Sequence, residues 1–340
     1  MRHGWMDGLR GLAVLAVVLM HADLATAGAL GLEAGPLRAV DELVGPVRMP
    51  LLVLLSGLLL PRSLAKGRSR HLRGKVDTIL WPYVVWASLD VAGALAYAHR
   101  DGRPLPWELV PQLLHDPQTY LWFLAYLFCF HVVGMLLPPL ARTLAGPLLV
   151  VAGEQLVDAS AHKFVVLLGW FLVGDALARE VGPRLPSILG RLADRTRWGP
   201  LAVVGRESVV YYATHLLVMQ AAVDLAVGLG LGTAPGVLLV AVVVPLGVAG
   251  VLVRLRGHPV VAALFVRPRV GSILGPQTTR AAARASRRGT HVWPLQVGDH
   301  EAQEGRDRRQ ARQAVRQADQ EHRDRGEDGR PRPLRQPDAL

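Results

Sequence analysis

Eight stretches of the sequence are apolar and close to the length that crosses a lipid bilayer. A spanning helix needs about 20 mostly apolar residues, and an α-helix satisfies its own backbone hydrogen bonds inside lipid. The pattern therefore predicts an all-α bundle of about eight transmembrane helices and excludes a soluble single domain. We expect a last apolar patch, 259–274, to be interfacial. The eight stretches are 8–30, 47–62, 78–98, 119–139, 143–158, 164–178, 200–223 and 235–253, of which the fifth is the weakest because Glu154 and Gln155 interrupt it.

The last part of the chain, 276–340, differs sharply from this apolar body. It carries many arginines interleaved with acids and shows no period that would bury an apolar face. Such a composition does not offset the entropy lost on ordering, so we predict a disordered Arg-rich tail after a transmembrane domain at 1–275. A nucleic-acid-binding or lipid-binding tail, or a tail read in a shifted frame, are the alternatives.

Two counts exclude further classes of protein. The single cysteine, Cys129, cannot form a disulfide within the chain and does not suffice for a cysteine zinc site. The net charge of +11 is compatible with nucleic-acid binding. In the body, however, the basic residues lie in short clusters between apolar runs, which is typical of membrane proteins. We therefore expect a lipid bilayer and no nucleic acid as a partner.

The basic clusters also predict the orientation of the bundle. The loop at 62–75 contains six basic residues and no acid, and further clusters follow the sixth and eighth stretches. Cytoplasmic loops of membrane proteins carry the excess of Lys and Arg. With eight alternating spans, all three clusters lie on the cytoplasmic side if both the N-terminus and the end of the last span are cytoplasmic.

Arg10 and His21 are ionisable residues within the first apolar stretch. They are separated by eleven positions, which is about three helical turns and about 16 Å along one face. Ionisable groups in a span normally face the protein interior or a wet cavity. The spacing places an arginine at the cytoplasmic boundary and an imidazole near the middle of the membrane. A boundary charge and a structural histidine are the alternative interpretation.

A polar stripe marks a second helix, since Ser208, Tyr211, Tyr212 and His215 are spaced i, i+3, i+4 and i+7. The stripe could bind a polyhydroxyl substrate or only join neighbouring helices. His131 stands alone, which favours a structural role. Without a His-x-x-x-His pair or a supporting carboxylate, we expect no metal site.

The basic loop contains Arg70 and Arg73 at i, i+3, which project together if the loop continues as a helix into the third span. Paired guanidinium groups bind phosphate well. Topological charge and contact with anionic lipid are the alternative interpretation.

Seven segments between residues 6 and 268 carry short motifs in a fixed order. The motifs are Asp7, Gly8, Leu9 and Arg10 with His21; Pro50, Ser56 and Gly57; Arg70 and Arg73; Pro82, Tyr83 and Trp86; Trp122, Phe123, Leu124, Tyr126 and Leu127; Ser208, Tyr211 and His215; and Leu264, Phe265, Arg267 and Pro268. Together they resemble the acyltransferase-3 family of bacterial membrane O-acyltransferases. That family generally has about ten spans rather than eight, and it has no counterpart of the tail.

The resemblance implies a membrane O-acyltransferase of the bacterial inner membrane that moves an acyl group, expected to be acetyl, from acyl-CoA to a hydroxyl of a glycan or glycolipid. Acyl-CoA would be a co-substrate, with no permanently bound cofactor. Its phosphates would meet Arg70, Arg73 and Arg10, and its pantetheine arm would extend towards His21.

The resemblance leaves two chemical routes open. His21 could act as a general base on the acceptor hydroxyl, or Ser56 or a tyrosine could form an acyl-enzyme. The resemblance also implies that Ser56, Trp122, Ser208, Tyr211 and His215 contact or support the acceptor. A polytopic transporter and a truncated inactive family member are the competing functions.

Overall fold

A computed structural model describes residues 4–115, 120–182 and 199–268, and every regular element in these ranges is a helix. The chain divides into two units, Met1–Arg269 and Val270–Leu340. The predicted tail at 276–340 lies outside the described residues, so its disorder stays a prediction.

Six helices of the described residues are apolar and long enough to cross a membrane, and two shorter apolar helices bring the number to the eight expected. The chain is therefore a multi-pass membrane protein. The six long segments contain α1 (Gly4–Leu30), α2 (Arg38–Gly57), α5 (Trp81–Arg100), α9 (Ala159–Glu180), α12 (Ser208–Gly228) and α13 (Ala234–Arg254), and the shorter helices are α7 (Trp122–Leu136) and α8 (Pro139–Gly153).

Short helices complete the first unit. The basic loop continues as a helix into the third span. Its helix α4 (Arg68–Lys75) leads through a π-helical turn, η1 (Val76–Leu80), directly into α5. The apolar patch after the eighth span forms only one short helix, α14. The others are α3 (Leu60–Leu64), α6 (Leu109–His115), α11 (Gly199–Arg206), η2 (Leu255–Gly257) and α14 (Pro259–Phe265).

The weak fifth stretch forms α8, which begins four residues earlier than expected and ends just before Glu154. Its outer face is apolar and exposed at every turn. Leu140, Leu144, Leu148 and Val151 are each 65–71% exposed. Because these positions repeat at i, i+4, i+8 and i+11, they form one stripe, as expected of a helix that faces lipid.

Glycines let pairs of helices approach closely. A Cβ added to Gly205 would overlap the Asp7 carbonyl oxygen, so α11 packs directly on the backbone of α1. A Cβ added to Gly57 would overlap the Phe171 carbonyl oxygen in the same way, where α2 meets α9. Small residues at contacts are a common means of helix association in membranes, where burial of apolar surface gives little driving force.

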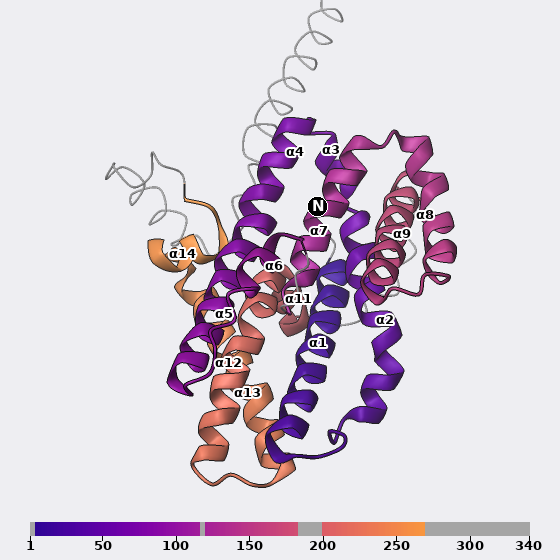
Figure 1. Cartoon of the computed structure of the whole chain (residues 1–340). Coiled ribbons are helices and arrows are strands. Elements are labelled where there is room, and N and C mark those ends of the chain that lie inside the picture. Colours follow the sequence, from indigo (N-terminus) through magenta and orange to yellow (C-terminus); the bar gives the residue numbers. More distant parts are fainter. Residues whose placement is uncertain (1–3, 116–119, 183–198, 269–340) are drawn as a thin grey trace, which may run out of the picture. The chain divides into compact units, whose positions relative to one another are not determined.

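The helices fall into two packed groups. Figure 1 shows α1 between α2 and the pair formed by α12 and α13, and α1 contacts all three. On the other side of α2 lie α8 and α9, which pack against each other. Aromatic rings of α7 and α9, including Phe130 and Phe171 at 5.9 Å between centroids, fill the space between those helices.

Candidate active site

Two histidines from distant parts of the sequence meet inside the bundle. His21 lies on α1 and His215 on α12, with ring centroids 4.9 Å apart and His215 Nε2 3.2 Å from His21 Nδ1. His215 is 1% exposed, whereas His21 is only half-buried. The pair joins the two histidines that the sequence singled out separately.

The hydrogen bonds of the pair fix its tautomers. His215 Nδ1 is 2.6 Å from the Tyr212 carbonyl oxygen, which only accepts, so Nδ1 carries the proton and Nε2 of the neutral ring accepts. His21 Nδ1 faces both that Nε2 and the Val17 carbonyl oxygen at 3.0 Å, so it must donate. The lone pair of neutral His21 therefore lies on Nε2, which is the atom that could accept a proton from a substrate.

Tyr212 and Tyr120 hold His215 in place. The Tyr212 hydroxyl donates to the Tyr120 carbonyl oxygen at 2.5 Å, and the Tyr120 hydroxyl donates to the Ala213 carbonyl oxygen at 2.7 Å. The Tyr120 ring also meets the His215 ring edge to face at 5.4 Å. These contacts tie the chain before α7 to α12, and they leave His215 little freedom to rotate.

The other members of the predicted stripe lie elsewhere. The Tyr211 hydroxyl lies beside Gly250 of α13, and Ser208 is the half-buried first residue of α12. The structure thus brings His215 together with Tyr212 and Tyr120, and it separates Tyr211 and Ser208 from that group.

Ser56 and Trp122, also predicted as supporting residues, make local contacts. The Ser56 hydroxyl donates to the Leu52 carbonyl oxygen at 2.9 Å within α2. Trp122 packs edge to face on Tyr126 and receives the Lys163 ammonium over its ring at 5.1 Å. Within the described part of the chain, neither side chain forms a hydrogen bond or ring contact with the histidine pair.

A second group of polar residues lies at the end of the bundle where α1 begins. Arg10 faces Asp7 at 3.9 Å and the Leu55 carbonyl oxygen at 3.5 Å. The Lys75 ammonium of α4 lies close enough for the positive charge of Arg10 to act on it. His71, also on α4, packs against His131 of α7 with ring centroids 5.3 Å apart. His131, which the sequence left alone, therefore has a histidine neighbour.

The helix α4 turns its two arginines outward. Arg70 and Arg73, spaced i, i+3, lie on one face of the helix and are both exposed. On the other face, His71 is 3% exposed and Lys75 is half-buried. Sequence reasoning selected the exposed pair and missed the inward one. One feature of the sequence could have pointed to Lys75, because it is one of only three lysines in a chain with 35 arginines.

Two further ionisable groups in the spans were also missed. Arg48 forms an ion pair with Asp41 on α2, and both charges act on His21. Asp90 of α5 is half-buried, acts electrostatically on Tyr120, and forms no hydrogen bond or ion pair with a described residue. Among the residues that the structure describes, no three His, Cys, Asp or Glu side chains gather as a metal would require.

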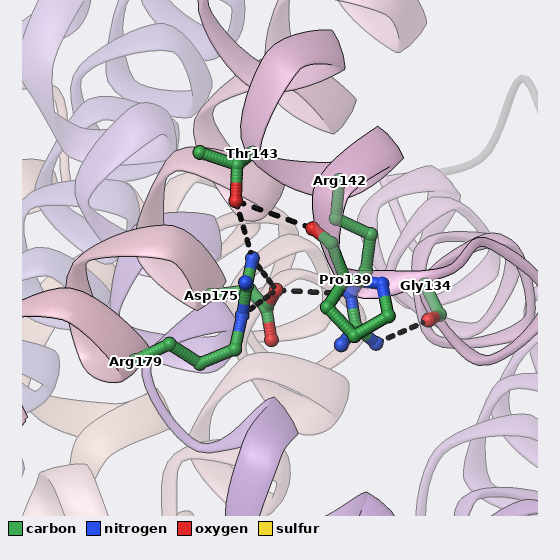
Figure 2. A network of polar contacts seen from close by, with 6 residues as sticks. All are labelled: Gly134, Pro139, Arg142, Thr143, Asp175 and Arg179. Carbon is green, nitrogen blue, oxygen red and sulfur yellow. Dashed lines mark hydrogen bonds and ion pairs between the residues drawn. The ribbon is translucent and has the colours of Figure 1, made fainter.

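A separate ionic network joins α7, α8 and α9. Asp175, fully buried, lies 3.0 Å from Arg142 and 2.9 Å from Arg179. Figure 2 shows how the remaining donors are used: Arg142 donates to the Gly134 carbonyl oxygen, and Arg179 donates to the Thr143 hydroxyl. Each guanidinium has an acceptor within the network, which indicates that the network has a structural role in joining the three helices.

Comparison with known proteins agrees with the motifs. Residues 3–154 match the acyltransferase domain model of the acyltransferase-3 family, and this range contains Arg10, His21, Arg70 and Arg73. It is somewhat less than half of the chain, and His215 lies beyond it. No match was found to a curated protein or to a solved structure. The match confirms the resemblance seen in the motifs over residues 3–154: this part of the chain is similar to the acyltransferase domain of that family, which indicates an acyltransferase, and the apolar helices make the chain a multi-pass membrane protein.

Proposed function

We propose that the protein transfers an acyl group, acetyl in the simplest case, from cytoplasmic acyl-CoA to a hydroxyl of a cell-envelope glycan or glycolipid. The observation that carries this proposal is the histidine pair, which presents a lone pair on His21 Nε2 inside a lipid-embedded bundle. We place the protein in the bacterial inner membrane with a cytoplasmic N-terminus, because the arginines of α4 then lie on the cytoplasmic side.

The length of the donor fits the spacing of its proposed contacts. Arg10 and His21 are eleven residues apart on α1, which corresponds to about 16 Å along the helix. An extended chain advances about 1.2 Å per bond, so the fourteen bonds from a CoA phosphorus to the acyl carbon reach about 17 Å. A phosphate held near Arg10 therefore lets the thioester reach His21.

In the proposed reaction, His21 Nε2 accepts the proton of the acceptor hydroxyl while that oxygen attacks the thioester carbonyl carbon. The carbon–sulfur bond then breaks, the thiolate of CoA leaves, and the imidazolium returns the proton to the sulfur. The positioning residue is His215, because its Nε2 accepts from His21 Nδ1 and keeps the other nitrogen basic. An acyl-enzyme on Ser56 is less favoured, since its hydroxyl is bonded to the Leu52 carbonyl oxygen rather than to a base.

The test compares variants in cells that carry the gene. We expect mass spectrometry of the envelope glycans to show an acyl-sized mass gain with the wild-type protein. His21→Ala should reduce it by about 10²-fold or more, since a general base contributes 10²- to 10⁴-fold. His99→Ala is the control, because His99 is exposed at the end of α5. A fully active His21→Ala protein would overturn the proposed mechanism.

The role of His215 has its own readout. His215→Gln keeps a side-chain acceptor and should retain more activity than His215→Ala. His215→Ala should also shift the pH profile of the rate, because His21 then loses the partner that holds its proton on Nδ1. Equal losses in the two variants with an unchanged pH profile would mean that His215 only fills space.

A further inference from the structure

The strongest unused feature of the bundle is a cluster of cationic and imidazole groups on the inward face of α4. His71 and Lys75 are spaced i, i+4, so they lie on the same face of the helix. The charges of Arg10 and Lys66 both act on Lys75, and Lys75 in turn acts on His71 and His131. Four polar side chains from α1, α4 and α7 therefore act on one another, and all of them are cationic or can become so.

Lys75 has no anionic partner in the described part of the chain. No hydrogen bond or ion pair of its ammonium to a described residue is found, and the Asp7 carboxylate faces Arg10. A half-buried ammonium without a counter-charge is costly in a protein interior. Proteins keep such groups where a ligand supplies the missing charge.

His71 provides an independent indication of an anion. Its Nδ1 is 2.7 Å from the Ser63 hydroxyl, and no other acceptor for that hydroxyl is found among the described residues, so the hydroxyl donates and the ring proton lies on Nε2. That Nε2 is buried and, although the His131 backbone acts on the ring, it makes no hydrogen bond of good geometry to a described residue, and neither does Nδ1 of His131. A buried donor without an acceptor costs about 1–3 kcal/mol, which a bound anion would recover.

The backbone at this point is also unusual. Lys75 is the last residue of α4, and the π-helical turn η1 begins directly after it. Such turns occur mostly as single insertions in α-helices and frequently at functional sites.

We propose that Lys75, together with Arg10 and the Nε2 proton of His71, forms an internal phosphate-binding site that holds a phosphate ester within the bundle. Resting on the proposed function, the inference assigns to this site a phosphate of the acyl-CoA donor. The inward face of α4 then anchors the donor, and Arg70 and Arg73 act as an exposed entrance. A lipid headgroup offers the same chemistry, so the experiment separates the two sources.

The experiment measures CoA binding by isothermal titration calorimetry to the full-length protein in nanodiscs. The wild type should bind CoA, and inorganic pyrophosphate should compete. Lys75→Met should weaken CoA binding tenfold or more and remove the competition, while Lys75→Arg should restore most of the affinity. Pantetheine, which has no phosphate, should bind the wild type and Lys75→Met equally. Arg100→Gln is the matched control, because it removes an exposed positive charge at the far end of α5, away from this cluster, and should change the affinity less than twofold.

Each remaining outcome has a definite meaning. Wild-type CoA binding with an unchanged Lys75→Met affinity would overturn the inference and leave the proposed function standing. Absence of CoA binding by the wild type would instead contradict the proposed donor. A Lys75→Met protein that binds CoA normally but no longer co-purifies with anionic phospholipid would assign the site to a lipid headgroup. His21→Ala should bind CoA like the wild type, because His21 acts only on the acyl end.

Discussion

Two groups of charges lie inside the bundle, and they are completed in different ways. Around Asp175, two guanidinium groups share one carboxylate, and their other donors reach a carbonyl oxygen and a hydroxyl (Figure 2). Around Lys75, an ammonium lies near Arg10 and the buried nitrogens of two histidines, with no acid of its own. We call the first group, Asp175 with Arg142 and Arg179, the closed network, because its carboxylate pairs with both arginines. We call the second, Lys75 with Arg10, His71 and His131, the open group, because no described acid pairs with Lys75.

The difference indicates what each group is for. Even the closed network is not fully hydrogen-bonded, since Arg142 Nε faces Asp175 at 3.0 Å outside hydrogen-bond geometry and Asp175 Oδ1 has no hydrogen-bond partner. The Asp175 carboxylate nevertheless pairs with both guanidinium groups, so its removal should affect folding. The open group has unmet donors, so its removal should affect ligand binding.

The largest effect that we expect is on the closed network. Asp175→Asn removes the carboxylate that both arginines of the described network share, and it leaves the buried Arg142 and the half-buried Arg179 without a counter-charge, which should cost about 3–5 kcal/mol of stability. We would measure thermal unfolding in detergent by fluorescence-detected size exclusion.

The control for Asp175→Asn is Asp101→Asn, which breaks exposed ion pairs with Arg100 and Arg103 and should leave the melting temperature almost unchanged. If the two variants melted at the same temperature, the network would contribute no more than a surface ion pair.

A smaller effect should follow from a change where α2 meets α9, beside the closed network. In Gly57→Ala, the new methyl group would overlap the Phe171 carbonyl oxygen and press on the Asp175 backbone nitrogen. Overpacking of this kind costs about 1–3 kcal/mol. The same melting experiment measures it.

Gly93→Ala is the matched control for Gly57→Ala. Gly93 lies inside α5 with no other atom near the position of a Cβ, so alanine should leave stability unchanged or raise it by up to about 1 kcal/mol. Equal losses in both variants would argue against close backbone packing between α2 and α9.

The sequence predicted the spans, both histidines of the pair, and Arg10 of the group around Lys75. Apolar length places the eight crossing helices, because lipid forces the backbone into helices whatever the tertiary packing. The helical period also placed Arg10 and His21 on one face. It did not predict that His21 meets His215, because that contact depends on how α1 packs on α12, 194 positions later.

The open group shows why the sequence did not predict His71 and Lys75 as ligands. Arg70 and Arg73 are the natural phosphate ligands by residue type and spacing, yet α4 turns them outward and turns His71 and Lys75 inward. The rotation of a helix about its axis is set by its neighbours, here α3 and α7. No local pattern in eight residues contains that information.

The smallest effect on stability should come from Lys75→Met. Methionine has a similar length and fills the same space, and the substitution removes a charge that has no partner in the described residues. Without CoA, we therefore expect stability to change by less than about 1 kcal/mol, in contrast to Asp175→Asn. Melting in detergent, with and without CoA, measures both quantities.

The contrast becomes sharper when CoA is added. A ligand that binds only the folded state at 100 times its Kd stabilises it by about 2.7 kcal/mol. Saturating CoA should therefore raise the melting temperature of the wild type and of Asp101→Asn, but the same concentration should raise that of Lys75→Met much less. If Lys75→Met were instead as unstable as Asp175→Asn without CoA, the Lys75 ammonium would be a packed structural charge. The closed network and the open group would then both have a structural role, although their contacts differ.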